Sequence, residues 1–152
     1  MNERNGLMER VFSHDKSSSA IENTFVCRSS YPEASMKQEM WKKAMDPKSD
    51  LSDNMKEAIF RGFQQWDQDE VRKPYIQEFL TTVFDVYKNS SFKFFKKFFF
   101  NNLPRHNEID MTFIEKLKDL KKNATASSQK PGAKNTQSFE NLLQEGIEIM
   151  SR

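Results

Sequence analysis

Side chains that commonly perform catalysis are few in this sequence and lie far apart. The two histidines, His14 and His106, each lack a second histidine three or four residues away, the spacing that brings two imidazoles to one metal ion. The single cysteine, Cys27, has no histidine near it in the sequence and falls within an expected helix, so we predict a buried, unreactive thiol. These residues indicate neither a nucleophile nor a metal centre.

The acidic cluster of Asp67, Asp69 and Glu70 does not predict a calcium site. It lacks the alternating oxygen ligands and the central glycine of a calcium-binding loop, and a solvated turn between helices is expected instead. The zinc motif HExxH, a cysteine pair and a phosphate-binding glycine loop do not occur in the sequence. We therefore predict no catalytic, cofactor-binding or metal-ligating residue within residues 1–152.

The composition indicates one helical domain or part of a larger protein. Hydrophobic residues make up 36% and charged residues 30%, and four glycines with five prolines are few for a turn-rich β fold. Because 24 basic residues nearly balance 22 acidic ones, the net charge of +2 gives no indication of nucleic-acid binding. The sequence has no run of about 18 apolar residues and no apolar signal core at its N-terminus, so we expect a cytoplasmic location.

The stretch 51–105 holds most of the phenylalanines and three helical patterns. Helices are expected from Asp53 to Asp67, from Pro74 onward, and from Ser91 to Asn101. The second of these has an apolar half and a polar half when drawn as a helical wheel. In the third, one arc of phenylalanines lies opposite three lysines: Phe92, Phe94, Phe95, Phe98 and Phe99 against Lys93, Lys96 and Lys97. We expect this arc to pack in a protein core, and contact with a membrane surface or with RNA is the alternative.

Gly62 lies inside the first of these predicted helices, which should turn Met55, Ile59, Phe63 and Trp66 inward. A glycine within a helix costs about 1 kcal/mol relative to alanine. Since a bare Cα allows a neighbouring backbone to come close, we expect another helix to approach at Gly62.

Four further helices are expected, at 18–29, 32–45, 110–122 and from Ser138. The last of them should have one apolar side, formed by Phe139, Leu142, Leu143, Gly146, Ile147 and Met150. The segment Asn123–Gln137 has no large apolar residue and is predicted to be a flexible loop. Helix starts recur about every 20 residues, so two helices form a unit of about 40, which is the spacing of HEAT-like repeats. The predicted fold is all-α, with antiparallel helix pairs stacked as a segment of a HEAT- or armadillo-like α-solenoid.

Several short segments between Asp15 and Arg152 suggest a known family when they are taken in order. The segment 31–41 (YPEASMKQEMW) is a helix that a proline initiates and a tryptophan ends, and Leu51-Ser52 follows it. Later segments are Gly62-Phe63-Gln64-Gln65, Gln68, Pro74-Tyr75-Ile76, Leu103-Pro104 and Leu142-Leu143-Gln144-Glu145-Gly146. Together they resemble the C-terminal helical domain of the zinc aminopeptidases of the aminopeptidase N family.

The resemblance implies that residues 1–152 are the later part of such a domain. In that family the domain closes over the catalytic domain, walls the substrate cavity and limits which peptides enter. The zinc cofactor and the catalytic motifs, which remove N-terminal residues from peptides, belong to the preceding domain, so no catalytic residue is carried over to this chain.

The implied partners are the catalytic domain of an aminopeptidase, in the same chain or another, and a peptide substrate through the full enzyme. No nucleic-acid partner is implied, and a membrane partner is not favoured. Two alternative functions remain open. One is a free-standing helical protein-interaction module, and the other is a basic helical protein of the membrane surface.

Overall fold

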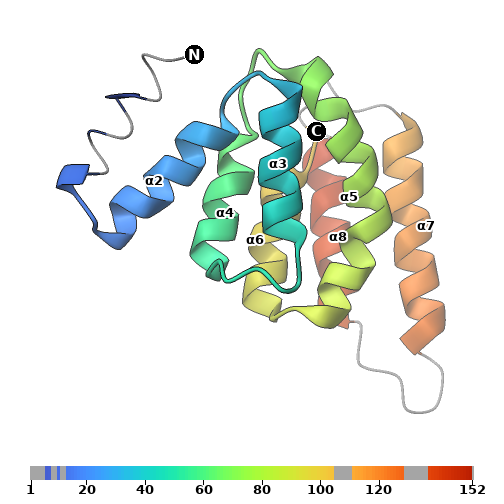
Figure 1. Ribbon diagram of the computed structural model, residues 1–152. Helices are drawn as coiled ribbons and strands as arrows, with labels where there is room; N and C mark the ends of the chain where they lie inside the picture. The colour runs from blue at the N-terminus through green and yellow to red at the C-terminus, as the bar shows by residue number, and fades with distance from the viewer. Residues whose placement is uncertain (1–5, 8–9, 11–12, 105–110, 129–136, 152) are drawn as a thin grey trace. The chain divides into compact units, whose positions relative to one another are not determined.

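A computed structural model describes residues 6–7, 10, 13–104, 111–128 and 137–151. Within these ranges the protein has seven helices and no strand, which confirms that the fold is all-α (Figure 1). In the described part of the chain no helix is both long and apolar enough to cross a membrane. The helices are α2 (Ser18–Ser29), α3 (Ala34–Met45), α4 (Asp53–Gly62), α5 (Asp69–Asn89), α6 (Phe92–Asn102), α7 (Met111–Ser128) and α8 (Gln137–Met150).

The chain divides into two compact units, Met1–Arg72 and Lys73–Arg152. The first unit contains α2, α3, α4 and the first turn of α5, and the second contains the rest of α5 with α6, α7 and α8. The division falls inside α5, next to Pro74. Each unit has its own buried apolar side chains.

In the first unit, α3 and α4 run antiparallel and α2 packs against α4 (Figure 1). Ser52 caps the N-terminal end of α4, because its side-chain oxygen accepts a hydrogen bond from the backbone N–H of Met55 at 3.3 Å. Trp41 of α3 is buried, and its ring centroid lies 5.7 Å from that of Phe60 and 5.6 Å from that of Phe63. This aromatic group forms the core between α3 and α4.

Helices α2 and α4 approach each other most closely at Gly62, the last residue of α4. A Cβ atom at this position would lie 2.5 Å from the Cβ of Ser29 and 2.5 Å from the carbonyl oxygen of Val26. Both neighbours belong to α2. The predicted close approach at Gly62 is therefore confirmed, and α2 is the helix that makes it.

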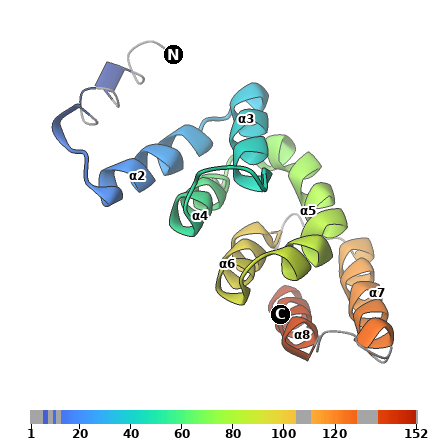
Figure 2. The same ribbon diagram turned by 60° about the horizontal axis from the view of Figure 1, so that its bottom comes forward.

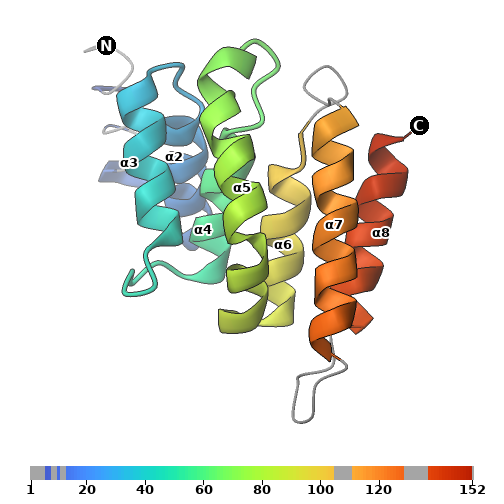
Figure 3. The same cartoon turned by 90° about the vertical axis from the view of Figure 1, so that its right-hand side faces the viewer.

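The second unit is held together by aromatic rings, with α7 and α8 antiparallel at its C-terminal side (Figure 3). The Phe79 ring of α5 lies 5.5 Å from that of Phe98 in α6 and 6.4 Å from that of Phe113 in α7. Phe139 of α8 contacts Phe95 of α6 at 5.6 Å. Four members of the predicted arc are buried, namely Phe94, Phe95, Phe98 and Phe99. The arc therefore packs in a protein core, as expected, except for Phe92, which is 49% exposed.

The connection between α4 and α5 differs from the prediction. Helix α4 ends at Gly62 rather than at Asp67, and Trp66 is 81% exposed instead of facing inward. Glycine is a poor helix former, and the residues after it form a turn toward α5. Helix α5 begins at Asp69, before Pro74, because carboxylates are favourable in the first turn of a helix. The acidic cluster is therefore partly helical, not wholly a turn.

Helix α7 also differs from the prediction, because it extends to Ser128 instead of ending at Lys122. Ala124 is 1% exposed, and the Thr125 hydroxyl donates a hydrogen bond to the Lys121 carbonyl at 3.1 Å. Alanine is the best helix former, and burial of its methyl group adds to that preference. The first part of the predicted loop Asn123–Gln137 is thus helical, Gln137 starts α8, and residues 129–136 lie outside the described ranges.

Candidate functional site

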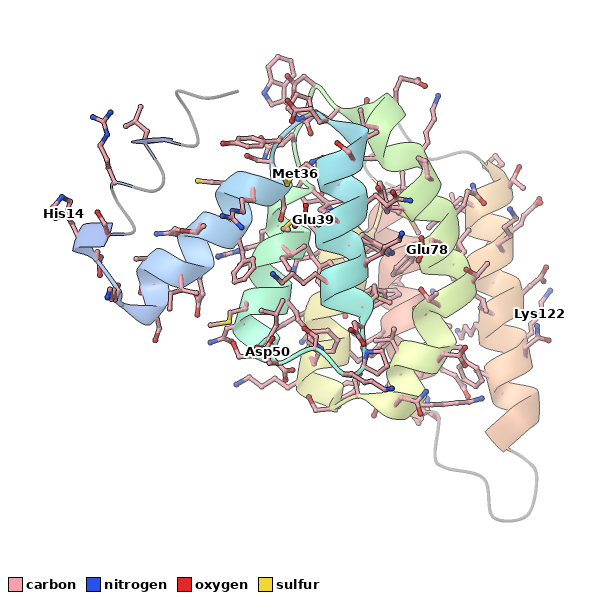
Figure 4. The ribbon with its side chains drawn as sticks, in the orientation of Figure 1. His14, Met36, Glu39, Asp50, Glu78 and Lys122 are labelled. Atoms are coloured by element: carbon pink, nitrogen blue, oxygen red, sulfur yellow. The ribbon has the colours of Figure 1, made fainter. Side chains whose placement is uncertain are left out.

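The structure does not bring the chemically reactive side chains together. His14 is exposed on the N-terminal segment, away from Met36 and Glu39 of α3 (Figure 4), and His106 lies outside the described residues. Cys27 is exposed, so the prediction of a buried thiol is wrong. It fails because Val26 and Ser29 provide the contact of α2 with Gly62 of α4. Among the described residues no group of three or more His, Cys, Asp or Glu side chains is placed to hold a metal ion.

The most unusual side chain of the first unit is Lys37 of α3, which is 0% exposed. Its Nζ donates a hydrogen bond of 2.5 Å to the carbonyl oxygen of Ser29, the last residue of α2. It also lies 4.8 Å from the centroid of the Phe63 ring. Carbonyl groups at the C-terminal end of a helix carry partial negative charge. Lys37 therefore stabilises the end of α2 through this hydrogen bond and through charge.

The pKa of Lys37 is lowered from 10.5 to about 8, mainly by burial and also by the nearby positive charge of Arg72, while the negative charge of Asp67 opposes the change. A lysine with a pKa in this range suits general-base or covalent chemistry when a substrate can reach it. Here the side chain is fully covered, so no substrate has access to Nζ. The arrangement favours a structural role for Lys37 over a catalytic one.

A second hydrogen bond joins the loop after α2 to the loop after α4. The side-chain Nε2 of Gln68, which is 8% exposed, donates to the carbonyl oxygen of Ser30 at 2.8 Å. Arg72, in the first turn of α5, is 3% exposed and lies close enough to Lys37 to act on its charge. The loop after α2 and the loop after α4 are thus fastened to each other. We call Ser29, Lys37, Phe63, Gln68 and Arg72 the lysine cluster.

The loop next to the lysine cluster carries an exposed aromatic side chain. The loop 63–68 has buried residues at both ends, Phe63 and Gln68, whereas Trp66 between them is 81% exposed. The amide of Gln65 donates a weaker hydrogen bond of 3.4 Å to the carbonyl of Gly62. An exposed indole on an anchored loop loses little conformational entropy on binding, which is typical of contact residues in interfaces.

The residue patterns did not predict the lysine cluster, although the sequence contains one signal for it. Lys37 lies at helical spacing with Met40, Trp41 and Ala44, all of which are buried. A lysine on the apolar stripe of a helix either interrupts the stripe or is a buried charge with a partner. Its acceptor, Ser29, lies on a different helix, so only the fold identifies it.

No protein-family model matches the chain, and no curated protein matches its sequence. The fold and the site define the class of molecule: an all-α protein whose first unit is arranged around a buried lysine and whose second unit has a phenylalanine core.

Proposed function

We propose that this chain is the non-catalytic C-terminal helical portion of a zinc aminopeptidase. In this role its helices stack as antiparallel pairs of an α-solenoid and wall the cavity in which a cytoplasmic enzyme removes N-terminal residues from peptides. The zinc ion and the reactive groups would come from a catalytic domain, in the same polypeptide or in a partner. The chain itself contributes packing surface and shape.

One observation carries this proposal: segments that resemble the family at separate places in the sequence contact one another in the fold. The segment 31–41 contains Lys37, whose ammonium group lies over the ring of Phe63 in the Gly-Phe-Gln segment. Gln68, another residue of the resemblance, bonds to Ser30 directly before the first segment. A family retains segments that pack against each other, so such segments should be in contact in the fold. The contacts seen here therefore support common descent of the segments.

A second resemblance segment has a similar packing role in the second unit. Gly146 ends the Leu-Leu-Gln-Glu-Gly segment of α8, and a Cβ there would lie 2.8 Å from Cζ of Phe99 in α6. Leu142 and Leu143 of the same segment are buried. The matching residues thus lie at helix contacts in both units, where a change of residue would disturb the packing.

The size and activity of the native protein test the proposal. An antibody against α8 would be used to detect the protein and to precipitate it from cells that express it, with a pre-immune antibody as control. We expect a polypeptide several times larger than 18.0 kDa, or an 18.0 kDa chain in complex with a larger one. In either case the precipitate should hydrolyse aminoacyl-anilide substrates in a zinc-dependent, chelator-sensitive manner.

Other outcomes of the same experiment would support the alternatives. A monomeric 18.0 kDa protein whose precipitate has no aminopeptidase activity would refute the proposal and would favour a free-standing interaction module. In that case Trp66 is the first residue to examine, because it is the most exposed of the large apolar side chains in the described part of the chain.

A further inference from the structure

The outer face of α6 carries lysines, and the helix itself contains no acidic residue. The stretch from Lys88 at the end of α5 to Pro104 contains lysines and no acidic residue. Lys88, Lys93 and Lys96 are all exposed. Lys88 lies 3.9 Å from the centroid of the Phe84 ring, which fixes its charge near the α5–α6 corner. We call Lys88, Phe92, Lys93 and Lys96 the α6 face.

Helix α7 shows that lysine content alone does not produce such a face. It has exposed lysines at Lys116, Lys118 and Lys122, but Glu115 and Asp119 lie among them. The Nζ of Lys122 is 3.3 Å from a carboxylate oxygen of Asp119, and its side chain points away from the unit (Figure 4). The local charge of α7 is therefore partly neutralised by residues of the same helix, whereas α6 contains no acidic residue.

An exposed apolar ring lies within the same face. Phe92 is 49% exposed at the first position of α6, one residue before Lys93 and one helical turn before Lys96. The remaining phenylalanines of the arc cannot serve a partner, because Phe95, Phe98 and Phe99 are 0% exposed in the core formed with α5 and α8 (Figure 2). A partner would meet lysines and one ring, not the whole apolar arc.

We propose that the α6 face is a peripheral docking surface for an anionic lipid bilayer. Lysines near such a surface gain electrostatic energy from the negative headgroups, and an exposed phenylalanine gains by entering the boundary between headgroups and acyl chains. The expected mode is adsorption of a folded unit, with the helical core intact. This inference is independent of the proposed aminopeptidase role.

The exposed ring favours lipid over a nucleic acid as the partner. Phosphate groups of a nucleic acid also attract lysines, but Phe92 would then need an unpaired base to stack on. The overall net charge of +2 is small for a nucleic-acid-binding protein. At a bilayer both kinds of side chain are used together, which matches the composition of the α6 face.

Co-sedimentation of the full chain with vesicles tests the proposal. At about 0.1 M salt the protein should bind vesicles of phosphatidylserine and phosphatidylcholine, and it should bind pure phosphatidylcholine vesicles much more weakly. The triple variant Lys88→Gln, Lys93→Gln, Lys96→Gln should lose about 100-fold in partitioning, and Phe92→Ser about tenfold. Circular dichroism would check that each variant keeps the helix content of the parent.

The matched control is the triple variant Lys116→Gln, Lys118→Gln, Lys122→Gln, which removes the same charge from α7. It should change partitioning by less than about threefold, because carboxylates already balance these lysines. Equal losses in the two triple variants would overturn the proposal, since binding would then depend on net charge alone. Failure of the parent chain to sediment with anionic vesicles, or tighter binding to a single-stranded oligonucleotide than to them, would overturn it as well.

Discussion

Replacing Gly62 with alanine should destabilise the first unit, although alanine is the better helix former. The added Cβ would lie 2.5 Å from the carbonyl oxygen of Val26 and from the Cβ of Ser29. Both atoms belong to α2 or are fixed directly to its backbone, so relief of the contact requires movement of a helix. The steric effect therefore opposes the propensity effect.

The expected magnitude follows from these two opposing effects. Alanine gains about 1 kcal/mol over glycine within a helix, and less at its last residue. Overpacking of a core costs about 1–3 kcal/mol, and contact with backbone falls at the upper end because the backbone cannot rotate away. The free energy of unfolding should thus fall by about 2 kcal/mol in Gly62→Ala.

Gly146→Ala is the matched control in the second unit. There the new Cβ would lie 2.8 Å from Cζ of Phe99, which is the far end of a side chain rather than backbone. Relief of the contact requires a tilt of the Phe99 side chain, which is 0% exposed, so a steric cost of about 1–2 kcal/mol opposes a gain of about 1 kcal/mol in helix propensity. The stability of this variant should remain within about 1 kcal/mol of the parent.

Urea unfolding followed by tryptophan fluorescence provides the assay for Gly62→Ala. Both tryptophans belong to the first unit, and Trp66→Phe leaves the buried Trp41 as its only reporter. The midpoint should shift to lower urea with an unchanged slope. An equal or higher midpoint would refute the close-contact argument. Adding Ser29→Gly to Gly62→Ala should recover only part of the loss, because the contact with the Val26 carbonyl remains.

Three further predictions concern the lysine cluster, the loop and the absent chemistry. The pKa of Lys37 is lower in the folded protein than in the unfolded chain, so as the pH rises the folded protein loses this proton first. The free energy of unfolding should therefore rise by about 1–2 kcal/mol between pH 7 and 9.5. Urea titrations should show this rise in the parent and not in Lys37→Met. Trp66→Ser should leave the thermal midpoint within about 2 °C of the parent, since the ring is exposed, and a larger drop in calorimetry would contradict its placement. The purified 152-residue chain should neither hydrolyse aminoacyl anilides nor bind zinc tightly, and chelator-sensitive turnover would show otherwise.

Helical periodicity by itself determined much of the fold. The apolar stripe of α8, with Phe139, Leu142, Leu143 and Ile147, is buried as predicted, and the ends of α2 agree with the sequence pattern. Such stripes are local, because residues three and four apart share a face in any helix. The sequence alone therefore predicted which elements form and, for α8 and most of α6, which face is buried.

Helix ends and polar contacts required the tertiary structure. Propensity did not predict the end of α4 at Gly62 or the extension of α7 to Ser128. The exposure of Cys27 depends on which face of α2 meets α4, and the burial of Lys37 depends on an acceptor eight residues away on another helix. Contacts between helices are set by packing geometry, which no single helix encodes. That is why the sequence predicted the helices, whereas the lysine cluster and the α6 face became visible only in the fold.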